Sequence, residues 1–241
     1  MFNSFKCSVL IITVCCSFTA TVLSQVVTQP GSVVSTFVSP PTPIFIDDIS
    51  GKPFLEKKDD AIKGSPLLLA NWHPGSVTFR NGQQAKGLQL LYNVNKNILY
   101  FKRGEGILEF VQPIREFTLR ITKDNDSVDI VFRNGYVGFE KNNQETFYEV
   151  LTDGAIQLLK QYTKTLLTYK PYNQPETQEY SDKVKYFIYR ENKLTLIKRD
   201  KEFLMQAFPD LSNKIRSWCE ANNSNAKSEP HLAALIGSLN K

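Results

Sequence analysis

The sequence is poor in the residues that build metal sites and nucleophilic dyads, since its 241 residues include only two His and four Cys. It contains no Gly-x-Ser-x-Gly, His-Glu-x-x-His, Cys-x-x-Cys, P-loop or dinucleotide-binding motif. We therefore predict no catalytic residue, no metal site and no cofactor, and expect a protein that is not an enzyme. A hydrolase with an active site assembled from dispersed residues is the remaining enzymatic alternative.

Charge of one sign is also scarce. The formal net charge is +5, from 29 Lys and Arg against 24 Asp and Glu, and the cations form no long run. Aromatic and cationic residues do interleave at 100–103, 162–172 and 183–190, as they would on a nucleic-acid stacking platform. Alternation in a half-solvated sheet gives the same pattern, so we expect no nucleic-acid partner.

Long apolar runs are confined to the N-terminus. Residues 7–23 carry no charge, they follow Lys6, and Val22 and Ser24 suit a cleavage before Gln25. This pattern predicts a secretory signal peptide over residues 1–24. An uncleaved membrane anchor is the alternative, because the uncharged run approaches the length that spans a bilayer. No later run is long enough, so we predict no transmembrane span after signal cleavage.

Cleavage would leave Cys219 as the only cysteine, and one cysteine cannot form an internal disulfide. The protein would therefore be exported and yet depend on its core for stability. We predict a location in the periplasm or in association with the outer membrane.

The remaining chain divides by composition into three parts. Residues 25–65 hold five of the twelve prolines and predict an extended, Pro-rich leader. Residues 66–198 consist of short runs of alternating hydrophobicity separated by turn residues, which predicts an antiparallel β domain. Residues 199–241 have helical periodicity and predict an α-helical tail packed on the β domain.

The fold class that follows is mainly β: an antiparallel meander of about ten strands, closed as a sandwich or a partly open barrel, with a C-terminal helical tail. The predicted strands are 76–80, 87–92, 98–102, 107–111, 116–121, 127–132, 145–151, 155–169, 183–190 and 193–198. The segment 155–169 is ambiguous, because the spacing of its apolar residues also fits a helix. In the tail, Asp200 is a predicted N-cap, and Ser228 or Glu229 begins the last helix.

Two short patterns have both a structural and a functional interpretation. Phe-Arg-Asn-Gly occurs at 79–82 and again at 132–135, which suggests either a duplicated module or two ordinary hairpin turns. Cys219 and His231 could form a thiolate pair, but Cys219 lies beside Trp218 on an amphipathic helix, where a small hydrophobic residue is expected.

One cluster is a candidate ligand site. Trp72 and His73 stand side by side just before the first predicted strand of the β domain. An exposed Trp-His pair could line a binding site, whereas a buried pair would staple the edge of the core. We name Trp72 and His73 as candidate ligand-binding residues.

The tail resembles that of a group of uncharacterised exported proteins of the Gram-negative cell envelope. The likeness rests on Phe203-Leu204 followed by Phe208-Pro209-Asp210, and on a final apolar helix ending near Leu239-Asn240. Strands with the patterns Gly-x-Val-x-Phe at 75–79 and Lys-Leu-x-x-Ile-Lys at 193–198 are similar as well. The resemblance implies a β-rich body, an envelope location and no known function.

Two functions from different classes remain. The first is a non-catalytic envelope protein that binds or scaffolds a protein or glycan partner. The alternative is a periplasmic carrier of a lipid-like amphiphile, for which the helices would cover an apolar cavity. A cavity of several hundred Å³ would favour the carrier, and a filled interior would favour the binding protein.

Overall fold

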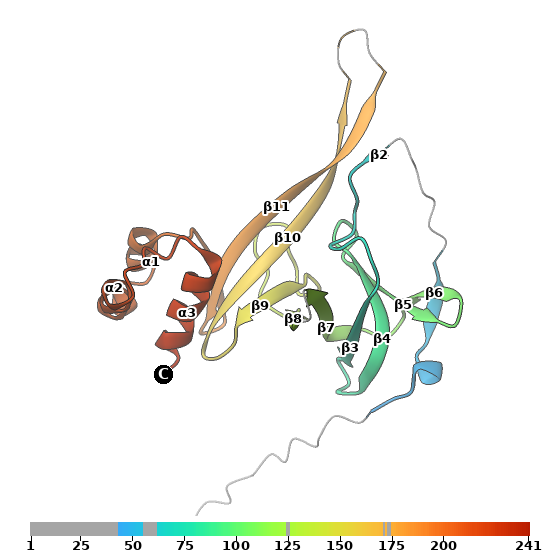
Figure 1. The fold of residues 1–241 in the computed structure, drawn as a ribbon, viewed down its shortest axis with the longest axis horizontal. Helices are drawn as coiled ribbons and strands as arrows, with labels where there is room; N and C mark the ends of the chain where they lie inside the picture. Colours follow the sequence, from blue (N-terminus) through green and yellow to red (C-terminus); the bar gives the residue numbers. More distant parts are fainter. Residues whose placement is uncertain (1–42, 55–61, 124–125, 171, 173–174) are drawn as a thin grey trace, which may run out of the picture. The chain divides into compact units, whose positions relative to one another are not determined.

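In the described part of the chain, the alternating segments form one open sheet of twelve strands, almost all antiparallel, which is followed by three α-helices (Figure 1). The computed structural model describes residues 43–54, 62–123, 126–170, 172 and 175–241. The predicted signal peptide 1–24 and residues 25–42 of the predicted leader lie outside the described residues. The predicted mainly β fold with a helical tail is confirmed.

The strands follow one another in the sheet in the order β1-β6-β5-β4-β3-β7-β8-β9-β10-β11-β12, and β2 pairs in parallel with β11. Their bounds are β1 Gly51–Pro53, β2 Ile62–Lys63, β3 His73–Phe79, β4 Gln84–Asn93, β5 Ile98–Arg103, β6 Gly106–Phe110, β7 Ile114–Lys123, β8 Asp126–Arg133, β9 Tyr148–Thr152, β10 Ile156–Tyr169, β11 Thr177–Arg190 and β12 Lys193–Ile197. The ambiguous segment 155–169 is therefore a strand, and it pairs with β11 over its whole length.

The two Asn-Gly pairs have different structures. At the first, Gly82 has φ +85° and the side chain of Asn81 accepts a hydrogen bond from the backbone N–H of Gln83, which closes the β3–β4 hairpin. At the second, the side chain of Asn134 donates to the carbonyl of Ile114, and Gly135 N–H donates to the carbonyl of Gln144. The second pair thus opens a loop between β8 and β9 instead of a hairpin.

One core lies among strands β3 to β8 and is rich in aromatic rings. Phe117 stacks on Phe132 with ring centroids 4.8 Å apart, and Tyr92 lies against both rings. Ile49 belongs to this core and is fully buried, while β1 pairs with β6. Part of the predicted leader therefore belongs to the folded β domain.

Two further cores sandwich the C-terminal strands. On one face, residues such as Leu158 and Ile188 pack against the helices; on the other, Leu159 and Phe187 pack against Tyr148. The two faces follow from register, because Leu158 opposes Ile188 and Leu159 opposes Phe187. The base of the β10–β11 hairpin is thus covered on both faces.

The helices are α1 Lys201–Ala207, α2 Ser212–Ala221 and α3 Glu229–Leu239, with short 3₁₀ turns at Ile46–Asp48 and Pro209–Leu211. As predicted, the Asp200 side chain caps α1 by accepting from the N–H of Phe203, and Ser228 caps α3. Asn240 ties the end of α3 to the sheet, since its side-chain amide bonds both the N–H and the carbonyl of Ile156. Within the described part of the chain, no helix is long and apolar enough to cross a membrane.

Candidate interaction surface

Of the two predicted ligand-binding residues, Trp72 directly precedes β3 and His73 is its first residue, and both are partly buried. The ammonium of Lys102 stands 5.0 Å from the centroid of the Trp72 ring, in a cation–π arrangement. His73 opposes Leu90 in the β3–β4 ladder. The face of the indole is therefore occupied by a lysine, and the imidazole lies in a paired strand. Neither observation tests ligand binding by these two residues, which stays a prediction.

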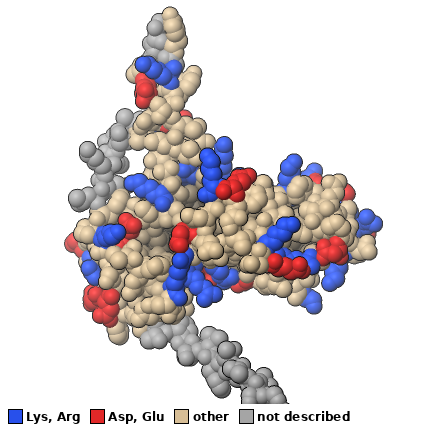
Figure 2. All heavy atoms as spheres, turned by 180° about the vertical axis from the view of Figure 1, so that it is seen from behind, with Lys and Arg blue, Asp and Glu red and all other residues tan. Residues whose placement is uncertain are grey.

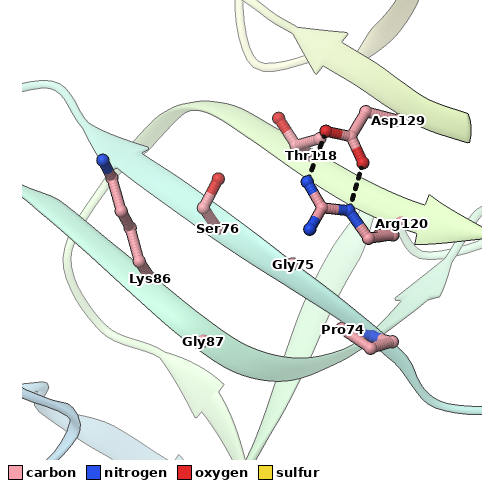
Figure 3. Close-up of a pocket in the computed structure, with 8 residues that line it drawn as sticks. All are labelled: Pro74, Gly75, Ser76, Lys86, Gly87, Thr118, Arg120 and Asp129. Atoms are coloured by element: carbon pink, nitrogen blue, oxygen red, sulfur yellow. Dashed lines mark hydrogen bonds and ion pairs between the residues drawn. The ribbon is translucent and has the colours of Figure 1, made fainter. Parts of the chain in front are cut away.

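A hollow of about 350 Å³ begins one residue further on and spans strands β3, β4, β7 and β8 (Figure 3). It is formed around a bulge at Gly75, where a Cβ would lie 2.1 Å from the carbonyl oxygen of Thr118. Its rim carries Lys86, Arg120 and Asp129. The close approach of β7 thus requires glycine at this position, and this gives the Gly-x-Val-x-Phe pattern a structural reason.

The charges on this rim are largely internally neutralised. Arg120 Nε and Nη2 donate to the two carboxylate oxygens of Asp129 at 2.7 and 2.8 Å, as Figure 3 shows. These hydrogen bonds hold the pKa of Asp129 below its usual value, so the pair stays ionised at neutral pH. A carboxylate fixed in this way is a poor general acid or base.

A partly buried ionic group lies where α3 meets the sheet, and we call it the Lys160 cluster: Glu149, Lys160, Tyr162, Tyr186 and Glu229. Lys160 Nζ lies 2.9 Å from Glu229 Oε2 and 3.8 Å from Glu149 Oε2. Tyr162 donates to Glu149 and Tyr186 donates to Glu229, each at 2.6 Å. The cluster joins three strands to the first turn of α3.

The two carboxyl groups of the Lys160 cluster have opposite pKa shifts. Burial raises the pKa of Glu149 and outweighs its hydrogen bond from Tyr162 and the charge of Lys160. Burial acts on Glu229 too, but hydrogen bonds from Tyr186 and Lys160 outweigh it and lower its pKa. The cluster lines neither the hollow of Figure 3 nor the one described below, so its geometry serves to attach the helix.

Cys219 and His231 do not form a reactive pair. The Cys219 thiol is buried in the core beneath the helices, and burial raises its pKa. His231 lies at the exposed start of α3, where its Nδ1 is 3.0 Å from the hydroxyl of Ser224. The expectation that Cys219 serves as a small core residue agrees with this placement.

The surface that stands out is the outer half of the β10–β11 hairpin, which runs past the end of β9 (Figure 1). We call residues 163–169 of β10 and 177–183 of β11 the arm, and residues 156–162 and 184–190 the base. Leu167 and Tyr169 on the arm expose 52% and 67% of their surface, and Tyr172 at its tip exposes 92%. Leu167 and Tyr169, together with Tyr180, line an open hollow of about 620 Å³ with a rim of Glu179, Ser181 and Asp182.

The arm is ordered by pairing and by polar contacts, since no described core cluster extends to it. Lys164 Nζ lies 3.0 Å from Asp182 Oδ2 on the opposite strand, and Gln178 donates to the hydroxyl of Thr168 at 3.3 Å. The short strand β2 adds a parallel partner along Gln178 and Glu179. The chain therefore presents apolar side chains to solvent on a defined hairpin.

The distribution of charge does not mark a second candidate binding surface on the visible face. Figure 2 shows basic and acidic side chains interspersed over the visible face, with no broad field of one sign. Several basic residues are held in ion pairs, for example Arg133 with Glu116 and Asp153. An extended single-sign surface would be needed for electrostatic binding of a polyanion.

Comparisons with known proteins give no relative: no family model, no curated protein and no solved structure matches this chain. The resemblance to exported Gram-negative envelope proteins therefore stays a prediction.

The sequence analysis noted interleaved aromatic and cationic residues at 162–172 but did not predict an exposed hairpin arm there, although strand length gives a signal for it. Strands of globular proteins are usually about 3–10 residues long, whereas β10 and β11 each have 14. The end of such a long strand extends beyond the packed core, unless the neighbouring strands are equally long. Residues 177–182 are almost all polar, so they show no alternation of apolar and polar side chains, and the predicted strand began only at residue 183.

Proposed function

We propose that this chain is an exported, non-catalytic protein of the cell envelope, in the periplasm or associated with the outer membrane, that binds or scaffolds a protein partner through the arm. The observation that carries the proposal is the exposure of Leu167 and Tyr169 on an ordered hairpin. Exposed apolar groups rimmed by polar residues are typical of protein interaction sites. Export is supported by the sequence of residues 1–24.

The composition of the arm favours a protein partner. Aromatic residues are enriched in protein interfaces because a ring supplies a large contact area at a low cost in conformational entropy. Tyr169 and Tyr172 offer such rings, and the adjoining threonines offer hydroxyl groups. A glycan partner has less support, because Lys102 lies over the ring of Trp72.

The alternative, a periplasmic carrier of a lipid-like amphiphile, has weaker support. Such a carrier needs an apolar cavity of several hundred Å³. The aromatic core is closely packed, with Phe117 and Phe132 centroids 4.8 Å apart and Tyr92 5.2 Å from Phe117. The hollow on the arm opens to solvent between charged side chains such as Glu179 and Asp182.

Site-specific photo-crosslinking in the exporting cell tests the proposal. A photoreactive amino acid replaces Tyr169 on the arm or, as a matched control, Val128 on β8, which is 60% exposed. We expect cross-links to a discrete protein at Tyr169 and none at Val128. Equal labelling at both positions, or labelling of lipid at Tyr169, would contradict a protein-binding arm.

Native mass spectrometry of the detergent-free protein separates the two functions. The binding protein should show the mass of the polypeptide or of a protein complex. An additional small mass that disappears on denaturation would instead support the carrier.

A further inference from the structure

The hollow of Figure 3 carries a row of hydrogen-bond donors across three strands. Lys86 opposes Ser76 in the β3–β4 pair, and Ser76 opposes Thr118 in the β3–β7 pair. Directly opposed residues of antiparallel strands lie on the same face of a sheet, with their Cβ atoms about 5 Å apart. One ammonium group and two hydroxyl groups therefore project from neighbouring positions on one face, as Figure 3 shows.

A guanidinium group stands at one end of this row. Arg120 follows Thr118 by two residues on β7, so its side chain leaves the same face of the sheet. Its Nε and Nη2 donate to Asp129, and its third nitrogen, Nη1, points away from that carboxylate (Figure 3). Asp129 accepts through both of its oxygens, so the one carboxylate that lines the hollow is already engaged.

The donors of the row have no acceptor of their own. Within the part of the chain that the structure describes, no hydrogen bond or ion pair engages the side chain of Lys86, Ser76 or Thr118. Ser76 and Thr118 are also partly withdrawn from solvent. The hollow therefore offers unused donors while its carboxylate is bound, and this complements an acceptor-rich, negatively charged group.

Two glycines line the hollow and leave its floor free of side chains. Gly87 has φ +70°, and only open space surrounds the position that a Cβ would take. At Gly75 the carbonyl of Thr118 leaves no room for a Cβ. The resulting volume of about 350 Å³ lies at the lower end of the range for small-molecule sites, roughly 300–1,000 Å³. A bare ion would fill only part of it.

We infer that this hollow binds the oxyanion group of a small phosphate or sulfate ester, between Lys86 and Arg120 and over the hydroxyls of Ser76 and Thr118. The terminal oxygens of such a group can accept from all four side chains, and lysine contributes its charge to phosphate sites in this way. The charged lining residues are Lys86, Arg120 and Asp129, which sum to +1 and favour an anion. The site does not use the arm, so it stands or falls separately from the proposed function.

Titration of the purified protein with inorganic phosphate tests the site. Amide NMR shifts are followed at constant ionic strength, and we expect saturable shifts at Ser76 and Thr118 with a dissociation constant in the millimolar range. The affinity should fall as chloride salt is added, because the flanking charges are exposed and screened. The absence of shifts at these two residues, or shifts that never saturate, would overturn the inference.

Two lysine substitutions separate a built site from general attraction to a basic protein. Lys86→Gln removes the ammonium of the row, and we expect the dissociation constant for phosphate to rise about tenfold. Lys141→Gln is the matched control, since it changes the net charge equally on the exposed loop between β8 and β9. It should leave the affinity unchanged; equal effects of the two substitutions would refute the site.

Removal of the hydroxyls tests direct contact with the anion. Ser76→Ala and Thr118→Val delete one donor each with little change in shape, and each should weaken phosphate binding about fivefold. Thr122→Val, further along β7 and outside the hollow, is the control and should bind like the unchanged protein. Thermal unfolding verifies that all three variants fold. Unaltered binding by both hydroxyl variants would contradict the proposed coordination.

Two further ligands distinguish a soluble ester from a lipid head group. Glycerol 1-phosphate is titrated by NMR, and vesicles with or without phosphatidic acid are tested by flotation. Binding of glycerol 1-phosphate alone, lost in Lys86→Gln, would assign a soluble ligand. Flotation with phosphatidic acid that is lost in Lys86→Gln would assign a lipid head group. Failure of both ligands to bind would refute an ester site.

Discussion

The base and the arm of the β10–β11 hairpin share the same strands and differ in almost everything that surrounds them. In the base, Leu158 and Leu159 are fully buried between two cores. In the arm, nine residues further along β10, Leu167 is half exposed and no described core reaches it. The difference shows that strand pairing and exposed polar contacts hold the arm, whereas packing between two cores holds the base.

The base and the arm also differ in the solvent exposure of their ion pairs. Lys160 in the base and Lys164 in the arm are almost equally buried, with about one-seventh of each side chain exposed (14% and 15%). Their partners differ, since the side chain of Glu229 is 30% exposed and that of Asp182 is 65% exposed. Water screens the second pair much more than the first.

Truncation of a leucine at each end of β10 should give the largest contrast. Leu158→Ala leaves a cavity between the sheet and the helices and should lower the free energy of unfolding by about 2–5 kcal/mol. Leu167→Ala removes an exposed side chain and should change it by less than about 0.5 kcal/mol. Urea denaturation monitored by tryptophan fluorescence measures both; equal losses would mean that the arm is part of the cooperative core.

Hydrogen exchange should resolve the same contrast without any mutation. The amides of Leu159 and Leu167 both point toward β11, but the arm can open locally while the base opens only with its cores. We expect Leu159 to exchange more slowly by a factor of roughly 10², which is about 3 kcal/mol. Similar rates at the two positions would contradict a locally opening arm.

The Lys160 cluster predicts a pH-dependent effect. The pKa of Glu229 is lowered in the folded protein, so its contribution to stability is present above the unfolded pKa and is lost as the pH falls through the folded one. At pH 7, Glu229→Gln should therefore lower the free energy of unfolding by about 1 kcal/mol, a value that allows for partial solvent screening. The difference from the unchanged protein should shrink as the pH falls below the ordinary glutamate pKa of 4.5 and vanish once Glu229 is protonated in the folded protein.

Glu149→Gln is the matched control within the cluster, because its pKa is shifted the other way. A raised pKa means that the contribution of Glu149 is present below its unfolded value and is lost as the pH rises. The amide oxygen of Gln can still accept from Tyr162, so this variant should lose less stability at pH 7 than Glu229→Gln. A larger loss would show that Lys160 depends mainly on Glu149.

Removal of the acidic partner in the arm should have the smallest effect. Asp182→Asn breaks the exposed pair with Lys164 and should change the free energy of unfolding by less than about 0.5 kcal/mol. Urea denaturation at low and high salt measures it. A loss as large as that of Glu229→Gln would remove the distinction between the two ion pairs.

Local sequence signals predicted many of the helices and strands, because helix caps and turns form between residues a few positions apart. Asp200 and Ser228 begin helices because their side chains accept hydrogen bonds from free N–H groups of the first turn. Asn81-Gly82 makes a hairpin because glycine adopts the required positive φ. The same dipeptide at 134–135 does not, since Asn134 bonds across the chain to Ile114.

Other features depend on residues far apart in the sequence and could not be predicted. Strand β1 was missed because three residues have no usable periodicity and are a strand only by pairing with β6. Segment 155–169 was ambiguous because its two apolar faces pack on two different cores, which hides the alternation. The Lys160 cluster joins positions up to 80 residues apart, from Glu149 to Glu229.

The sequence by itself determined the mainly β class, the helical tail, its caps and most strand positions, because hydrophobic periodicity and turn chemistry act within a few residues. Tertiary structure decided that the strands join in one open sheet and which leucines of β10 are buried. Those outcomes depend on which distant segments cover each face, and two identical leucine side chains on one strand acquire opposite roles for that reason.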